Sequence, residues 1–124
     1  MRVLVVDDFP TMRKILRNVL RRLNIEHTLE AENGKQALDL LKKEEIDLII
    51  SDWIMPEMTG IELLRACKDD PEIRHIPFIM VTAEAQKESV MEAIKGGVDN
   101  YIAKPFTPDK LQDAINKAKA KVTK

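Results

Sequence analysis

The chain has 124 residues, of which 44% are hydrophobic and 33% charged, and its formal net charge is −1. This composition predicts one soluble globular domain of ordinary size, and a charge so close to zero gives no indication of nucleic-acid binding. The single cysteine, Cys67, excludes an internal disulfide and is typical of a reducing compartment. The N-terminal apolar run, Val3 to Val6, is too short for a secretion signal or a membrane span, so we expect a cytoplasmic protein without a membrane partner.

Strand-like and helix-like patterns alternate along the whole chain. Short apolar runs predict five strands, at 3–6, 26–31, 47–51, 76–81 and 98–103. Apolar residues at three- and four-residue spacing predict five helices that follow them in turn, from residue 10 or 11, over 34–43, from 61 to before Pro71, over 85–95, and from 107 or 108 nearly to Lys124. The polar content of 26–31 places that strand at an edge of the sheet.

This alternation predicts a single α/β domain over residues 1–124, a doubly wound parallel sheet covered by helices on both faces. Cys67 falls on the apolar face of the third predicted helix, which indicates a core residue. The first predicted helix carries four arginines that lie mostly off its apolar face. We interpret them as a solvated surface rather than a binding patch; they are Arg13, Arg17, Arg21 and Arg22.

Polar residues end four of the predicted strands. They are Asp7 and Asp8, Asp52, Thr82, and Lys104. In a doubly wound sheet the carboxyl ends of the strands share one rim, and ligands bind there. Taken alone, each residue fits equally well as a helix cap or a surface group, and Asp52 on its own is as consistent with a loop cap as with a functional carboxylate. Together, the residues at four strand ends favour one functional site.

The combination of these residue types favours phosphoryl transfer. Three carboxylates on one rim repel one another, so one pKa rises unless a cation compensates, and Mg²⁺ with its preference for oxygen ligands is the natural candidate. The Lys104 ammonium suits a phosphoryl oxygen, and the Thr82 hydroxyl adds a donor. Positioning and charge neutralisation do most of the work in such reactions, and a carboxylate can itself be the nucleophile.

These residues give the chain a specific resemblance. The Asp7-Asp8 pair, Asp52 followed by Met55-Pro56 and Gly60, Thr82-Ala83, and Lys104-Pro105-Phe106 resemble the receiver domain of two-component response regulators, and the single-domain receivers of chemotaxis above all. The resemblance covers the whole chain. It implies the flavodoxin-like (βα)5 fold with strand order 2-1-3-4-5. It also implies a cis Lys104–Pro105 bond.

The resemblance further implies the role of each site residue. Asp52 is the phosphoacceptor for a sensor histidine kinase of the chemotaxis type. Mg²⁺ is bound directly by Asp8, by Asp52 and by the backbone carbonyl of Ile54, and through water by Asp7. Lys104 and Thr82 contact the phosphoryl group. Tyr101 is the aromatic switch that turns inward when Thr82 moves.

An output surface follows from the same resemblance. The fourth helix, the last strand and the last helix build the face with which such chemotaxis proteins bind the flagellar motor switch, as monomers. The matching positions are Ala85, Lys87, Tyr101, Phe106, Thr107 and Lys117. The two aromatics are the strongest of these candidates, because aromatic side chains anchor protein partners.

One site position departs from the pattern of the chemotaxis receivers. They usually carry Asn two residues after the phosphoacceptor, and this chain carries Ile54. The backbone carbonyl is unaffected, but an apolar side chain should hinder the approach of water to a phosphoryl group. Ile54 and Glu84, which follows Thr82 by two residues, are therefore candidates for tuning the dephosphorylation rate. The departure also puts a conventional dedicated phosphatase in doubt.

Other functions remain open at this stage. A phosphohydrolase with an aspartate nucleophile needs a second Asp two residues further on as general acid, and Ile54 occupies that position. A nucleotide or flavin binder on the same fold should carry a glycine-rich phosphate loop, and the chain has no G-x-x-x-x-G-K-[ST] or G-x-G-x-x-G run. Within the receiver interpretation, the chain can also be a phosphorelay intermediate or an isolated receiver of a larger regulator.

Overall fold

A computed structural model describes residues 1–84 and 86–122. Its centre is a five-stranded parallel sheet in the order β2-β1-β3-β4-β5, which confirms the predicted order 2-1-3-4-5. The strands are β1 (Arg2–Val6), β2 (His27–Ala31), β3 (Leu48–Ser51), β4 (Phe78–Thr82) and β5 (Asn100–Ala103). The polar strand β2 lies at an edge, as its sequence predicts, and β5 forms the other edge.

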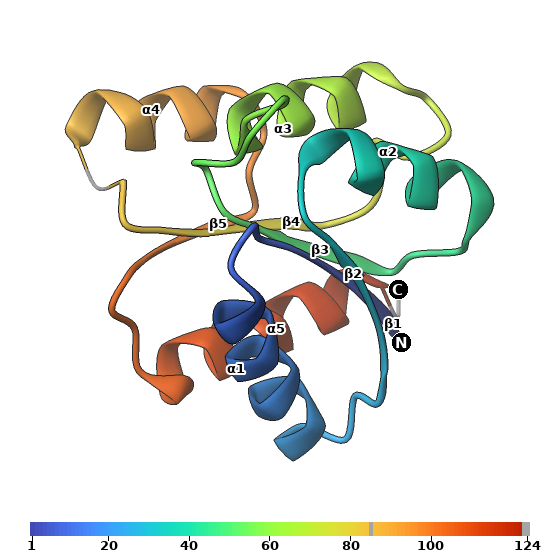
Figure 1. Cartoon of the computed structure of the whole chain (residues 1–124), viewed down its shortest axis with the longest axis vertical. Coiled ribbons are helices and arrows are strands. Elements are labelled where there is room, and N and C mark those ends of the chain that lie inside the picture. The colour runs from blue at the N-terminus through green and yellow to red at the C-terminus, as the bar shows by residue number, and fades with distance from the viewer. Residues whose placement is uncertain (85, 123–124) are drawn as a thin grey trace.

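Five helices cover the two faces of the sheet and give the molecule three layers. They are α1 (Pro10–Arg22), α2 (Gly34–Lys43), α3 (Gly60–Asp69), α4 (Lys87–Lys95) and α5 (Pro108–Val122). Helices α2, α3 and α4 lie on one face, and α1 and α5 lie on the other (Figure 1). Within the described part of the chain, none of these helices has the length and apolar character that a membrane span requires.

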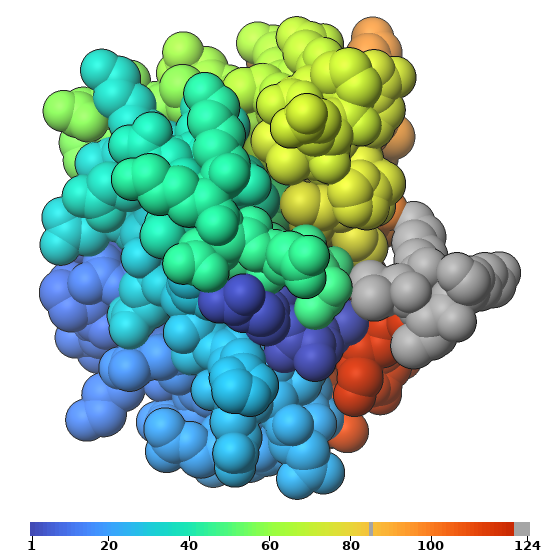
Figure 2. Space-filling model, turned by 90° about the vertical axis from the view of Figure 1, so that its right-hand side faces the viewer, coloured from blue at the N-terminus to red at the C-terminus, as the bar shows by residue number. Residues whose placement is uncertain are grey.

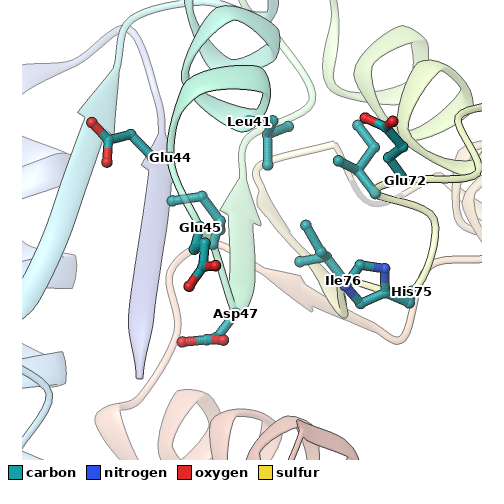
Figure 3. Close-up of a pocket in the computed structure, with 9 residues that line it drawn as sticks. Leu41, Glu44, Glu45, Asp47, Glu72, His75 and Ile76 are labelled. Carbon is teal, nitrogen blue, oxygen red and sulfur yellow. The ribbon is translucent and has the colours of Figure 1, made fainter.

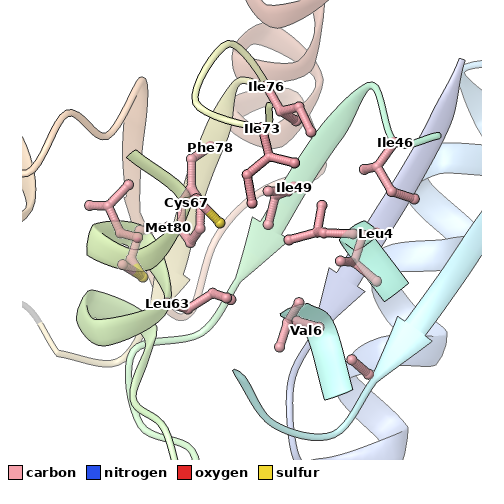
Figure 4. Close-up of a cluster of buried hydrophobic side chains, with 14 of the residues drawn as sticks. Leu4, Val6, Ile46, Ile49, Leu63, Cys67, Ile73, Ile76, Phe78 and Met80 are labelled. Atoms are coloured by element: carbon pink, nitrogen blue, oxygen red, sulfur yellow. The ribbon is translucent and has the colours of Figure 1, made fainter. Parts of the chain in front are cut away.

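Alternate residues of the strands point into two separate hydrophobic clusters. Leu4 and Val6 of β1 face α2 and α3, where they pack with Ile49, Phe78 and other residues (Figure 4). Val3 and Val5 point the opposite way and pack under α1 and α5. Because both faces are buried, the inner strands are continuous apolar runs without polar alternation.

Strands β2 and β3 begin one residue later than predicted, and β4 and β5 begin two residues later. Strand β4 begins at Phe78 rather than Ile76, because Pro77 has no N–H and the Ile76 N–H bonds the carbonyl of Ile73 in the preceding turn. Strand β5 begins at Asn100 rather than Val98, because the Val98 N–H bonds the carbonyl of Ala93 at the end of α4. In both cases a local turn takes the hydrogen bond that a strand would need.

The loop after β3 is limited at its far end by a well-defined helix start. Thr59 accepts a hydrogen bond from the Glu62 N–H, and the Glu62 carboxylate accepts one from the Thr59 N–H, which forms a capping box. The N–H and the hydroxyl of Thr59 both donate to the Glu62 carboxylate and lower the pKa of Glu62. Helix α3 therefore starts at Gly60, which holds the loop of residues 52–59 over the carboxyl end of the sheet.

The opposite pole of the molecule carries the amino ends of the strands. Figure 2 shows this face, with the N-terminal residues surrounded by the segments that lead into β2, β3 and β4. A cavity here is lined mainly by residues that precede β3 and β4, including Glu44, Glu45, Asp47, Glu72 and His75 (Figure 3).

Candidate functional site

The register of β1 and β3 places two of the predicted carboxylates side by side. Val6 is paired with Ser51, and the Asp52 N–H donates to the carbonyl of Val6 at 2.9 Å. The residues that follow this pair, Asp7 and Asp52, are both buried. One carboxylate oxygen from each of Asp7, Asp8 and Asp52 lies within 4.8 Å of the others. The structure thus brings together the acidic cluster that the sequence predicts.

Lys104 reaches this cluster from the end of β5. Its backbone N–H bonds the carbonyl of Thr82, and the Lys104–Pro105 peptide bond is cis, as predicted. Its Nζ lies 3.0 Å from Oδ2 of Asp7 and 3.3 Å from Oδ2 of Asp52. One ammonium thus partly compensates three carboxylates, and the cluster keeps an excess of negative charge.

Asp7 is held at both carboxylate oxygens. Oδ1 accepts the N–H of Phe9 at 2.9 Å, and Oδ2 accepts the Lys104 ammonium. Burial raises the pKa of Asp7 above its ordinary value, although the Phe9 N–H and Lys104 oppose that rise. For Asp7 the cost of burying the charged carboxylate therefore exceeds the stabilisation that the Phe9 N–H and Lys104 provide, and the nearby Asp52 adds a smaller increase.

Asp8 supplies the observation that tests whether a cation fits. Its Oδ1 is buried and has no hydrogen-bond partner among the described residues. A buried carboxylate oxygen without a partner is costly unless a cation occupies its vicinity. Three hard oxygen donors with an excess of negative charge match the chemistry of Mg²⁺, which accepts one or two carboxylates and keeps several waters. The residues present therefore fit this ion.

The loop after β3 orients Asp52 through its backbone. Oδ1 of Asp52 accepts the N–H of Trp53 at 2.7 Å, and the Trp53 carbonyl accepts the N–H of Gly60. The side chain of Ile54 is 60% exposed and lines the same cavity as Asp8 and Asp52. No hydrogen-bonding side chain therefore stands at this position of the cavity wall.

A chain of hydrogen bonds leads from the cavity to the edge of the sheet. Thr82 is fully buried, and its Oγ1 accepts the N–H of Glu84 at 3.2 Å. The carbonyl of Glu84 accepts the hydroxyl of Tyr101. Burial, with lesser contributions from Glu84 and Asp52, raises the pKa of Tyr101 to about 12, so this hydroxyl keeps its proton. The three residues link a cavity wall to an aromatic side chain on β5.

The cavity that contains the cluster has a volume of about 370 Å³ and a largely apolar wall. Besides the predicted residues, it is lined by Phe9 and Met12. Phe9 directly follows the acidic pair and is 63% exposed, which is unusual for a large apolar residue. In the sequence, only the position of Phe9 directly after the acidic pair could have indicated that it lines the site.

Two further contacts to the site are absent from the sequence prediction. The hydroxyl of Ser51 donates to the carbonyl of Asp52 at 2.9 Å. Arg13 donates from Nη1 to the carbonyl of Asp7 at 2.6 Å. The interpretation of Arg13 as part of a solvated helix surface was wrong: its side chain is only 11% exposed, because it folds back over the end of β1.

The residues predicted for the output surface lie on several elements. Lys87 is the first residue of α4. Thr107, directly before α5, and Lys117, within α5, are both exposed. Ala85 lies outside the described residues. Tyr101 packs against the cluster under α2 and α3, whereas Phe106 packs against the cluster under α1 and α5. The structure does not place these two aromatics in one cluster. Met91 and Ile94 of α4 are exposed apolar residues. The sequence did not predict their exposure, because their helical spacing is that of a face packed in the core.

The acidic cavity at the opposite pole does not form a comparable site. Asp47 accepts the N–H of Arg2 and Glu44 pairs with the Arg2 guanidinium, so these two carboxylates are compensated. Among the described residues, the one group of three or more metal-ligating side chains that lie close enough to share an ion is the cluster at the carboxyl ends.

The fold and the cluster match one family throughout. The model of the response regulator receiver domain matches residues 3–116. The chain belongs to the response regulator receiver domain family.

Relatives narrow this class to chemotaxis receivers. The chain is 47% identical over 117 residues to the chemotaxis protein CheY of Pseudomonas aeruginosa, with 94% of each chain covered. It is 48% identical over 116 residues to the CheY homolog of Campylobacter jejuni, with 93% of this chain and 89% of that protein covered. Among solved structures, CheY4 of Vibrio cholerae matches with a TM-score of 0.85 at 31% identity, over 94% of this chain and 97% of that chain. A receiver domain of a histidine kinase from Syntrophus aciditrophicus matches with a TM-score of 0.88 at 33% identity, over 96% and 89%.

Proposed function

We propose that residues 1–124 form a single-domain response regulator, phosphorylated on Asp52 by a histidine kinase in a Mg²⁺-dependent reaction. Phosphorylation changes its affinity for a downstream partner. The observation that carries the proposal is the position of Lys104, whose ammonium lies within hydrogen-bonding distance of both Asp7 and Asp52. Phosphoryl transfer requires a nucleophile and positive charge positioned beside it. Asp52 and Lys104 provide these, and the Asp8 oxygen that has no partner among the described residues is available to a metal ion.

The ion would be held directly by Asp8, Asp52 and the backbone carbonyl of Ile54, and through water by Asp7. When bound, Mg²⁺ neutralises negative charge on the carboxylates and on the phosphoryl oxygens. The Asp52 carboxylate forms a new bond to phosphorus while the bond from phosphorus to the donor breaks, and the bonding pair leaves with the donor. Lys104 and Thr82 then contact the phosphoryl oxygens. On this proposal the protein catalyses its own phosphorylation and dephosphorylation, and has no other substrate.

The hydrogen-bond chain at Thr82 is the proposed switch. The Thr82 hydroxyl, whose oxygen accepts the Glu84 N–H, can donate its proton to a phosphoryl oxygen on Asp52, and this bond draws Thr82 toward Asp52. Movement of Thr82 changes the loop that also receives the hydroxyl of Tyr101, so the aromatic ring responds to chemistry in the cavity. Ile54 lines the cavity, and Glu84 follows Thr82 and donates its backbone N–H to the Thr82 hydroxyl. We assign to these two residues the tuning of the phosphoryl lifetime.

The chemotaxis relatives support a particular pair of partners. We propose that a chemotaxis-type histidine kinase supplies the phosphoryl group and that a flagellar motor switch protein receives the signal, with the regulator acting as a cytoplasmic monomer. The partner surface consists of the output positions predicted from the sequence, namely Ala85, Lys87, Tyr101, Phe106, Thr107 and Lys117. With Ile54 at the cavity wall, a dedicated phosphatase of the usual kind has no amide to engage.

Acetyl phosphate tests the chemistry without any partner. Incubated with Mg²⁺ and acetyl phosphate, the intact protein should gain the mass of one phosphoryl group, and Asp52→Asn should abolish the gain. Asp39→Asn, which removes an equal charge on the exposed face of α2, is the matched control and should label normally. Rapid turnover of a phosphate ester by the wild-type protein would identify a phosphohydrolase instead.

A partner experiment separates the possible roles of a receiver. Beryllofluoride-treated and untreated protein are compared for binding to a flagellar switch peptide and to a histidine phosphotransfer domain. Tighter binding of the treated protein to the switch peptide supports the proposal. Transfer of the phosphoryl group from protein labelled with acetyl phosphate to the phosphotransfer domain, without switch binding by the treated protein, would favour the phosphorelay intermediate.

A further inference from the structure

Arg13 of α1 connects three parts of the molecule. Its Nη1 donates to the backbone carbonyl of Asp7 at 2.6 Å, and its Nε donates to Oε1 of Glu30 on β2 at 2.9 Å. Arg17, one helical turn further on, also pairs with Glu30, at 3.4 Å. Among the described residues, Arg17 makes no hydrogen bond or ion pair with β1 or Asp7, so the two arginines share Glu30 as a partner and differ in the contact to Asp7.

The carbonyl that Arg13 binds belongs to the peptide that joins Asp7 to Asp8. A peptide unit is planar, so holding its oxygen fixes the orientation of the whole plane up to the Cα of Asp8. The other groups of Asp7 are also held: its N–H bonds the Ala31 carbonyl, and its carboxylate accepts the Phe9 N–H and Lys104. Hydrogen bonds therefore hold the N–H, the carbonyl and the carboxylate of Asp7, the residue that precedes Asp8.

Asp8 itself depends on this backbone for its direction. Its Oδ1 is buried and has no partner among the described residues, so no hydrogen bond at that oxygen orients the carboxylate. The orientation of the Asp7–Asp8 peptide then decides where the carboxylate points. Metal ligands held by outer partners in this way lose affinity when the partner is removed.

We infer that Arg13 is a positioning residue for Asp8: by binding the Asp7 carbonyl it directs the Asp8 carboxylate toward a divalent cation. The inference rests on the proposed function, because it assigns a role in the same cation site. It predicts a change in cation affinity that is opposite in sign to the change expected from electrostatics alone. Loss of a positive charge near three carboxylates should by itself tighten cation binding, whereas loss of a positioning contact should weaken it.

The test measures Mg²⁺ binding through the fluorescence of Trp53, which directly follows Asp52. Arg13→Met keeps an unbranched apolar stem and removes the charge and the donors. It should raise the Mg²⁺ dissociation constant by about tenfold. Arg17→Met removes the same charge from the same ion-pair network and should leave the constant within about twofold of the wild-type value. Arg13→Lys, with one flexible donor group, should fall between the wild type and Arg13→Met.

A second measurement is made without the metal, so it does not depend on the reaction. In EDTA, amide hydrogen exchange of Asp8 and Phe9 should be faster in Arg13→Met than in the wild type, and unchanged in Arg17→Met. Far-UV circular dichroism and urea unfolding confirm that each variant is folded.

Two outcomes would overturn the inference. Mg²⁺ binding by Arg13→Met that equals or exceeds that of the wild type would show that charge alone matters. An equal loss in Arg17→Met would assign the effect to the Glu30 network. Failure of the proposed function is distinct: the wild-type protein would then show no Mg²⁺-dependent fluorescence change that Asp8→Asn abolishes.

Discussion

Gly60 lies so close to Asp52 that a Cβ on the glycine would stand 2.1 Å from the Asp52 carbonyl oxygen. The next nearest atoms are also backbone, so no side-chain rotation relieves the clash. Alanine is the better helix former by about 1 kcal/mol, but the overlap outweighs that gain. We expect Gly60→Ala to lower the free energy of unfolding by about 3 kcal/mol and to slow labelling by acetyl phosphate.

Gly96→Ala is the control for this prediction. A Cβ at Gly96 would lie 3.0 Å from Cδ2 of Leu64, the end of a flexible side chain. Its effect on the free energy of unfolding, measured in urea, should stay within about 1 kcal/mol. Equal effects of the two substitutions would contradict the role assigned to the close approach at Asp52.

Ile54 should determine how long a phosphoryl group survives. Its apolar side chain borders the cavity, so replacing it with Asn supplies a polar group that can hold an attacking water. We expect Ile54→Asn to speed autodephosphorylation by about threefold to tenfold, which corresponds to about 1 kcal/mol of barrier. The rate is followed by loss of the mass increment after acetyl phosphate is removed. Ile15→Asn alters an exposed apolar residue of α1 outside that cavity and should leave the rate unchanged. Equal phosphoryl lifetimes in Ile54→Asn and the wild type would contradict this role of Ile54.

We expect Asp8→Asn to stabilise the protein in EDTA and to weaken its binding of Mg²⁺. Removing one of three clustered carboxylates relieves repulsion, so the variant should be more stable than the wild type in EDTA by about 1 kcal/mol. Mg²⁺ at ten times its dissociation constant should stabilise the wild type by about 1.4 kcal/mol and the variant hardly at all. Urea unfolding with and without Mg²⁺ measures both effects, with Asp39→Asn as the charge control. A lower free energy of unfolding for Asp8→Asn than for the wild type in EDTA would contradict the repulsion assigned to the three carboxylates.

The pH dependence of stability should show the contribution of Cys67. The thiol is buried between α3 and the sheet, and burial raises its pKa from 9.0 to about 12 (Figure 4). Because the folded state holds the proton more tightly, this contribution is fully present below pH 9.0 and is lost as the pH rises toward 12. From pH 9 to pH 10 the free energy of unfolding should fall by about 1 kcal/mol more in the wild type than in Cys67→Ala. Parallel pH profiles of the two proteins would contradict the assignment.

Much of the site could be predicted because its residues are marked by local patterns. Asp7, Asp52, Thr82 and Lys104 each end an apolar run or directly follow one, and parallel strands bring such ends to one edge. The residues that support them carry no such mark. Ser51 looks like the last residue of a strand, and Arg13 looks like one of several arginines on a helix surface.

The sequence by itself determined the α/β class, the order of the ten elements and the strand-end residues, since hydrophobic period and turn residues act over a few positions along the chain. Only the tertiary structure decided which groups touch. The contacts of Lys104 with Asp7 and Asp52 join segments far apart in sequence, and the bond from Arg13 to the Asp7 carbonyl folds a side chain of α1 back over the end of β1. The burial of an Asp8 oxygen that has no partner among the described residues is likewise a property of the folded chain. Such contacts depend on strand register and helix packing, which no local pattern encodes.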